Sequence, residues 1–164
     1  KHGTKLIIND SVQVAMEVDA DGVHLGKDDM PIHSARALLG KNKIIGGTGT
    51  TMEDIVHIYE SGADYAGIGP FKFTATKKNL SPLLGLKKYK DFSLQLQNQK
   101  IEIPIIAVGG ILVSDVHPLL RMGIYGVAVS SAIFSAAFPN QSLYEFQKSV
   151  QINTENPSYV IDNS

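Results

Sequence analysis

The sequence predicts an α/β fold in which parallel strands alternate with helices, and three observations support it. Short apolar runs recur along the chain, and each ends in small or polar residues before a segment with helical periodicity. The segments DADGVHLG, SGADYAGIG and RMGIYGVAVS repeat one order, a small-residue break followed by a glycine-rich strand. Strands that alternate with helices at this pitch are typical of parallel sheets with right-handed crossovers. The pattern contains six βα units.

Each element can be placed in chain order from its residue pattern. Apolar runs predict strands over residues 5–8, 22–25, 43–46, 65–68, 105–108 and 125–129. Apolar residues at helical spacing predict helices over residues 11–18, 32–39, 51–61, 84–97 and 114–123, and a short helix after Ser131. Pro31, Thr51 with Asp54, and Ser114 are start signals, and Gly123 is a stop signal. We expect one domain over residues 1–151 and a polar tail over residues 152–164.

The last two strands predict a phosphate pocket. The run IIAV ends at Gly109 and Gly110, and the run YGVAV ends at Ser130 and Ser131. Backbone N–H groups at such strand ends and helix starts attract phosphate, and glycine lets a ligand approach the backbone closely. In (β/α)₈ barrels, phosphate sits at the loops after the last two strands. Six units do not close that barrel, so an open doubly wound sheet is the competing fold, although the G-x-G-x-x-G dinucleotide motif is missing.

Composition narrows the classes of function. The formal net charge of the 164 residues is −1 and no basic run occurs, which argues against a nucleic-acid surface. The sequence contains no cysteine, which excludes disulfides and thiolate zinc sites and favours a reducing, cytoplasmic environment. The apolar runs are too short to span a bilayer, so we expect no membrane association. The histidines show no spacing to serine or aspartate that indicates a hydrolytic triad.

Polar residues follow the first two predicted strands. Asn9 and Asp10 follow the first, and Asp28 and Asp29 follow the second, so these residues belong to neighbouring loops of one rim. Two carboxylates that meet diphosphate oxygens there suit Mg²⁺. Helix capping by Asp10 or Asp28 is the competing interpretation, and Asp29 fits either role.

The third and fourth strands end in hydroxyl and lysine residues. Thr48, Thr50 and Thr51 follow the third strand and suit hydrogen bonds to a polar heterocycle, although capping explains Thr51 equally well. The fourth loop, GPFKFTATKK, contains Lys77, which suits a clamp on diphosphate or belongs to a solvated charge cluster. His24 alternates with apolar neighbours, so we expect it to face the barrel interior as a core residue.

Six motifs together resemble a known family. LIIND, DGVHLGKDD, GADYAGIGP, TATKK, AVGGI and GVAVSSAI occur in the order and spacing of thiamine-phosphate synthase, between residues 5 and 133. The resemblance implies a (β/α)₈ TIM barrel of which this chain carries about six units, the first two being missing. It also implies a transferase that joins hydroxymethylpyrimidine diphosphate to a thiazole phosphate and releases diphosphate.

The resemblance implies roles for individual residues. Asn9 and Lys77 would contact the pyrimidine diphosphate, and Asp10 and Asp29 would hold Mg²⁺ between its phosphates. Thr48 stands where the family usually has a serine near the pyrimidine, so Thr48 and Lys77 are the candidate catalytic residues. The thiazole phosphate would contact Thr74, Ala75, Thr76, Gly110, Ser130 and Ser131. The implied reaction is a dissociative displacement, in which diphosphate leaves and the thiazole nitrogen attacks the pyrimidine methylene cation. Such a reaction needs positioning and electrostatics rather than an enzyme nucleophile.

The sequence departs from the family pattern at two places. The first two βα units are missing, together with a Gln-x-x-x-Lys segment, so we expect additional N-terminal sequence in the native protein. Thr50 replaces the family's usual histidine after the third strand. A thiazole tautomerase, a related isomerase, is an alternative function. Thr50 argues against it, because a hydroxyl is a poor proton shuttle. A non-catalytic domain that binds thiazole phosphate or thiamine phosphate is another alternative. The sequence leaves open whether the protein forms a homo-oligomer.

Overall fold

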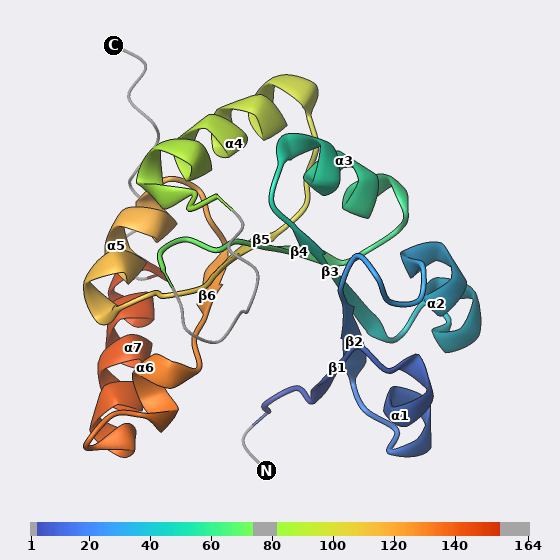
Figure 1. The fold of residues 1–164 in the computed structure, drawn as a ribbon, viewed down its shortest axis with the longest axis horizontal. Coiled ribbons are helices and arrows are strands. Elements are labelled where there is room, and N and C mark those ends of the chain that lie inside the picture. The colour runs from blue at the N-terminus through green and yellow to red at the C-terminus, as the bar shows by residue number, and fades with distance from the viewer. Residues whose placement is uncertain (1–2, 74–81, 155–164) are drawn as a thin grey trace.

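The computed structural model describes residues 3–73 and 82–154, which form one parallel sheet with helices on its outer side (Figure 1). The six strands follow chain order, β1-β2-β3-β4-β5-β6, and every neighbouring pair is parallel. Their bounds are β1 Ile7–Asn9, β2 Gly22–Leu25, β3 Ile44–Gly49, β4 Tyr65–Ile68, β5 Ile105–Val108 and β6 Gly126–Ala128. The prediction of a parallel α/β fold is confirmed. Within the described ranges the sheet is an open half-barrel, so the closed eight-stranded barrel stays a prediction.

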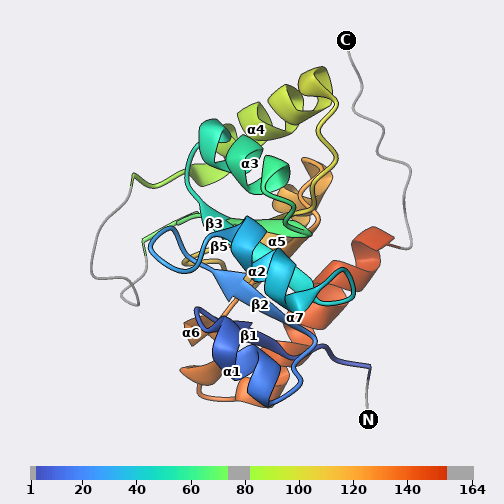
Figure 2. The same ribbon diagram turned by 90° about the vertical axis from the view of Figure 1, so that its right-hand side faces the viewer.

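Helices lie on the outer side of the sheet, and the first five connect successive strands. They are α1 Val12–Glu17, α2 Ile32–Leu39, α3 Met52–Glu60, α4 Gly85–Gln99, α5 Val113–Arg121, α6 Ser131–Phe134 and α7 Pro139–Thr154. Figure 2 shows α1, α2 and α3 following one another around the outside of the sheet. Among the residues described, no helix combines the length and apolar character needed to cross a membrane. The tail predicted over residues 152–164 stays a prediction, because only the end of α7 falls within it.

Two hydrophobic clusters join the sheet to its helices. The smaller cluster packs α1 and α2 onto β2 and β3, and its buried members are Val12, Ala15, Ala20, Val23, Leu25, Ala35 and Ile45. The larger cluster packs α3, α4, α5 and α7 onto the strands that follow, with Ile55, Ile68, Tyr89 and Leu119 fully buried. Because side chains alternate along a strand, the outward packing of Val23 and Leu25 directs His24 to the concave side. This placement confirms the expected orientation of His24.

Helix starts agree with the predictions at α3 and differ at α5. The Thr51 hydroxyl accepts from the Asp54 N–H at 3.2 Å and the Asp54 carboxylate accepts from the Thr51 N–H at 3.0 Å, which forms the predicted capping box. The prediction of Ser114 as an N-cap is wrong. The N-cap of helix α5 is Leu112, two residues earlier, and the Asp115 carboxylate accepts from the Leu112 N–H at 3.0 Å.

The interpretation of Asp10 or Asp28 as a helix cap is also wrong. The Ser11 hydroxyl caps α1 by accepting from the Val14 N–H at 3.2 Å, and Pro31 precedes α2. Neither aspartate is therefore needed for a helix start.

Ion pairs connect neighbouring segments at the amino end of the sheet. Lys5 contacts Asp21 at 2.8 Å between the starts of β1 and β2. Lys43 contacts Asp19 at 2.5 Å between the starts of β3 and β2. Arg36 contacts Asp64, the residue before β4, at 2.6 Å. We call these three pairs the amino-end clasp, and they link the segments around the starts of β1, β2, β3 and β4 at the end of the sheet opposite the carboxyl ends of the strands.

Candidate functional site

The carboxyl ends of all six strands lie on one rim, since the strands are parallel. Asn9 ends β1 and pairs in register with His24 of β2, and the Asp10 N–H donates to the His24 carbonyl at 2.8 Å. Asp29 lies in the loop that follows β2. The structure therefore places the predicted metal ligands Asp10 and Asp29 on neighbouring loops, as the sequence pattern required.

The donor chemistry at these two loops fits magnesium. Asp10 is exposed and adopts a left-handed backbone conformation with φ 69°. Asp29 is half-buried, and one of its carboxylate oxygens accepts from the Gly26 N–H at 2.6 Å. The described ranges hold no group of three or more His, Asp or Glu side chains that suits a metal. Mg²⁺ takes one or two carboxylates and completes its shell with water and substrate phosphates, so two aspartates are sufficient.

At the end of β3, two of the three predicted threonines are used by the helix cap. The Asp54 carboxylate accepts from the Thr50 N–H at 2.7 Å and from the Thr50 hydroxyl at 3.1 Å. Lys27, from the loop after β2, contacts the same carboxylate at 2.7 Å. Partial burial raises the pKa of Asp54, but the Lys27 ammonium and the backbone donors outweigh burial and hold that pKa below its usual value. Thr50 thus belongs to the cap, and Thr48 carries the hydroxyl directed to the concave face.

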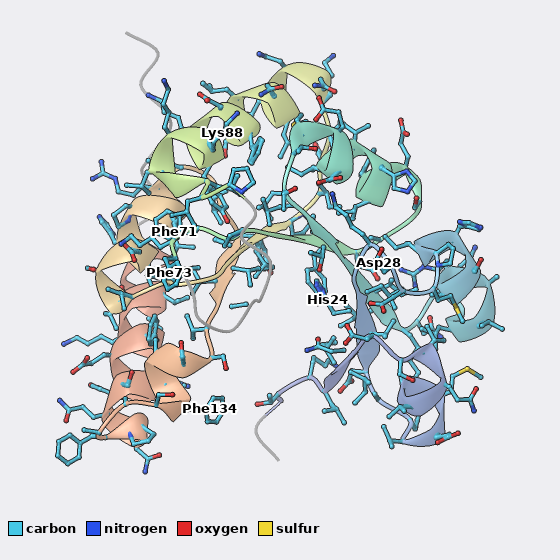
Figure 3. The ribbon with its side chains drawn as sticks, viewed as in Figure 1. His24, Asp28, Phe71, Phe73, Lys88 and Phe134 are labelled. Carbon is cyan, nitrogen blue, oxygen red and sulfur yellow. The ribbon has the colours of Figure 1, made fainter. Side chains whose placement is uncertain are left out.

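Thr48 is joined to two aromatic side chains inside the arc. Its Oγ1 lies 2.8 Å from His24 Nε2, and His24 Nδ1 lies 2.9 Å from the Tyr65 hydroxyl. The imidazole and phenol rings stack with their centroids 5.4 Å apart. Figure 3 shows His24 pointing from its strand into the concave side. Tyr65 was predicted only as the start of a strand, and its place opposite His24 depends on the register of β2, β3 and β4.

The loop after β4 is fastened to the end of β5. The Phe71 N–H donates to the Val108 carbonyl at 2.8 Å, and the Lys72 N–H donates to the Gly109 carbonyl at 3.0 Å. Lys72 also contacts Asp115 of α5 at 2.7 Å. Gly110 has φ +66°, and a Cβ there would lie 2.6 Å from the Phe73 carbonyl oxygen. Chain packing alone therefore requires glycine at this position, whereas the sequence analysis explained the glycine only by the close approach of a ligand to the backbone.

The remaining predicted site residues belong to the last two strand ends or to the β4–α4 loop. Val108 pairs in register with Ala128, so Gly110 and Ser130 occupy equivalent positions two residues further along neighbouring chains. Ser130 and Ser131 are exposed at the start of α6. The predicted Thr74, Ala75, Thr76 and Lys77 lie outside the described residues.

Comparison with known proteins agrees with this arrangement. The family model described as thiamine monophosphate synthase matches residues 1–133. Thiamine-phosphate synthase of Bacteroides thetaiotaomicron is 52% identical over 134 residues, which cover 82% of this chain and 64% of that protein. Thiamine-phosphate synthase of Phocaeicola vulgatus is 48% identical over a match that covers 84% of this chain and 66% of that protein.

A solved structure has a similar fold. A thiamine phosphate pyrophosphorylase from Pyrococcus furiosus superposes with a TM-score of 0.76 at 33% identity, covering 89% of this chain and 67% of that one. The chain thus spans about two thirds of the length of these relatives. Since the family model covers most of the chain, including every candidate site residue from Asn9 to Ser131, the chain belongs to the thiamine monophosphate synthase family.

Proposed function

We propose that the whole protein is a thiamine-phosphate synthase, which couples hydroxymethylpyrimidine diphosphate to a thiazole phosphate and releases diphosphate. The observation that carries the proposal is the distribution of candidate residues on one rim. Asn9, Asp10 and Asp29 follow β1 and β2, whereas Gly110 and Ser130 follow β5 and β6. Two phosphorylated substrates can therefore bind opposite each other, with their reacting ends directed to the middle of the rim.

The residues divide between the two substrates. We assign the pyrimidine diphosphate to Asn9, Thr48 and Lys77, and the thiazole phosphate to the segment with Thr74, Ala75 and Thr76 together with Gly110, Ser130 and Ser131. Asp10 and Asp29 would hold Mg²⁺, which when bound neutralises the charge of the diphosphate. The half-buried Asp29 is held by the Gly26 N–H, which restricts the directions open to its carboxylate.

The chemistry assigned to the chain is positioning and charge stabilisation. The carbon–oxygen bond between the pyrimidine methylene and the diphosphate breaks, the oxygen keeps the electron pair, and the thiazole nitrogen forms the new bond to carbon. Lys77 would stabilise the charge that develops on the leaving diphosphate, and Thr48 would orient the pyrimidine. No residue of the chain needs to act as a nucleophile.

Two further βα units are part of this proposal. About a third of the length of the relatives lies outside the match, and a barrel of eight strands closes where six leave an open arc. We propose that the two additional units fill the gap between β1 and β6 in the complete enzyme, and that the Mg²⁺ and substrate sites are complete only then.

The tautomerase alternative gains no support at position 50. A proton shuttle there would have to face the rim, but the Thr50 hydroxyl donates to Asp54 at 3.1 Å and is part of the α3 cap. Position 50 is therefore used for local structure in this chain.

A magnesium titration of product formation by the full-length protein tests the proposal. We expect thiamine phosphate from the two substrates in the wild-type protein, loss of this activity in Asp10→Ala, and nearly normal activity in Asp28→Ala, the matched control on the neighbouring loop. Binding of thiazole phosphate to Asp10→Ala, measured by calorimetry, should be retained. Absence of product with the wild type would refute the proposed function, and full activity of Asp10→Ala would remove Asp10 from the metal site.

A further inference from the structure

We infer that Tyr65 and His24 are positioning residues, which fix the direction in which the Thr48 hydroxyl donates its proton to a ligand at the rim. The inference rests on the proposed function, in which Thr48 contacts the pyrimidine. It adds that this contact is a hydrogen bond donated by Thr48, so that the substrate group recognised there is an acceptor such as a ring nitrogen.

The three side chains form a linear arrangement across three neighbouring strands. Tyr65 begins β4, His24 lies in β2, and Thr48 lies in β3 between them. The Tyr65 hydroxyl lies 2.9 Å from His24 Nδ1, and His24 Nε2 lies 2.8 Å from Thr48 Oγ1. Both distances are those of good hydrogen bonds, and the imidazole connects the two hydroxyls.

Two glycines make room for the rings. A Cβ on Gly46 of β3 would lie 2.1 Å from Cζ of Tyr65, and a Cβ on Gly67 of β4 would lie 2.8 Å from Cε1 of His24. Real Cβ contacts are longer than this, so a side chain at either position would displace its aromatic neighbour. The concave face is therefore shaped to hold the phenol and the imidazole across the neighbouring strands.

The proton positions follow from the chemistry of the two hydroxyls. A phenol is the stronger donor and the weaker acceptor, because its oxygen lone pair is delocalised into the ring, whereas an aliphatic alcohol accepts well. Burial raises the pKa of Tyr65, so the phenol stays protonated. As the stronger donor of the two hydroxyls, the phenol donates to His24 Nδ1, which lies 2.9 Å away. The imidazole then carries its proton on Nε2 and donates to Thr48 Oγ1.

This order leaves the Thr48 proton for another acceptor. In the reverse order Thr48 would donate to His24 Nε2, and the threonine oxygen would offer only lone pairs to a ligand. The two orders thus predict opposite ligand groups at Thr48, an acceptor in the first and a donor in the second. The preference of the phenol for donation selects the first.

Histidine NMR of the wild-type full-length protein tests the proton positions directly. At about pH 8, where an ordinary imidazole is neutral, we expect ¹⁵N shifts of His24 that mark Nε2 as protonated and Nδ1 as unprotonated. The His24→Gln variant assigns the signals. A wild-type protein with the proton on Nδ1 would overturn the inference, whatever the enzyme's activity.

Steady-state kinetics tests the positioning role. In Tyr65→Phe we expect kcat/KM for the pyrimidine diphosphate to fall about 3- to 10-fold, the effect of one neutral hydrogen bond, with the KM for thiazole phosphate unchanged. Thr48→Ser should keep most of the activity because it keeps the hydroxyl. Tyr89→Phe is the matched control, since the Tyr89 hydroxyl donates to the Ile68 carbonyl on the helix-facing side of the sheet and should affect stability without this selective loss.

The outcomes separate the two proposals. If the wild type forms product but Tyr65→Phe has unchanged kinetics, the positioning role is refuted and the proposed function stands. If the wild type forms no product, the proposed function fails, and the NMR measurement still decides the proton order.

Discussion

Replacement of Asp54 measures how firmly the loop after β3 is held. The Asp54 carboxylate accepts from the Thr50 N–H at 2.7 Å and from the Thr51 N–H at 3.0 Å, and it contacts Lys27 at 2.7 Å. Asp54→Asn keeps an oxygen that can accept from both N–H groups but removes the charge. Asp54→Ala removes the charge and the acceptor together, so the pair of variants separates the two contributions.

The structure sets the size of each effect. The Lys27 side chain is 52% exposed, so its ion pair contributes no more than about 0.2–1 kcal/mol. The charge at the start of α3 adds about 0.3–1 kcal/mol, which gives about 1 kcal/mol for Asp54→Asn. Loss of the two backbone hydrogen bonds, at about 1 kcal/mol each, brings Asp54→Ala to about 3 kcal/mol.

Urea unfolding at pH 7 measures both values. With an m-value of about 2 kcal/mol/M, the midpoint should fall by about 0.5 M in Asp54→Asn and about 1.5 M in Asp54→Ala. Asp28→Asn, which alters an exposed carboxylate on the loop after β2, is the control and should leave the midpoint unchanged.

The pH dependence has a definite sign. The pKa of Asp54 is lower in the folded protein than in the unfolded chain, where it is about 3.9. Its contribution is therefore complete above the unfolded pKa and is lost as the pH falls through the folded pKa. We expect the difference between wild type and Asp54→Asn to persist at pH 7 and to shrink below about pH 4. Equal midpoints for the Asn and Ala variants, or a difference that grows in acid, would refute the reasoning.

Two other substitutions test the carboxyl-end loops. Gly110→Ala should lower the free energy of unfolding by about 2–3 kcal/mol, because the left-handed backbone strain adds to a clash with the β4–α4 loop. Gly62→Ala is the control in the same urea assay. Gly62 has φ +85° and nothing within 4 Å of an added Cβ, so this substitution should cost only about 1–2 kcal/mol. Lys72→Met should cost about 1 kcal/mol, since it leaves the 11% exposed Asp115 carboxylate without its ion-pair partner. The same Lys72→Met change should cost almost nothing when it is made in Asp115→Asn, and an equal cost in both backgrounds would contradict the pairing.

Much of the sheet could be predicted from sequence, because buried parallel strands are short apolar runs between helices. The predicted bounds of β2, β4, β5 and α2 agree with the structure. The strand ending at residue 46 was predicted too short. Thr48 and Gly49 look like loop residues in the sequence, but they pair with Gly67 and Ile68 because β4 continues beside them after the pairing with β2 has ended at Gly47.

The helix α7 was not predicted. Over residues 139–151, whose side chains the structure describes, the exposed residues are mostly polar and Phe146 is the one buried residue, so the apolar periodicity is weak. Tertiary packing against α5 and α6, rather than a local pattern, holds this helix in place.

The site was predictable at the level of loops rather than atoms. Alternation of apolar residues placed His24 on the concave face, and strand ends placed Asp10 and Asp29 on neighbouring loops. The contact of His24 with Thr48 and Tyr65 depends on the relative register of three strands, which a single sequence does not contain. The use of Thr50 by the α3 cap, instead of by a ligand, likewise became visible only with the Asp54 side chain in place.

The amino-end clasp has a consequence for how this fold can change its chemistry. Lys5–Asp21, Lys43–Asp19 and Arg36–Asp64 all lie at the end of the sheet opposite the candidate site. The loops of the candidate site can therefore be varied, by evolution or in a directed-evolution library, while the ion pairs of the amino-end clasp are kept. A scaffold of this kind tolerates new specificities, because the residues that choose a substrate are different from those that hold the strand starts together.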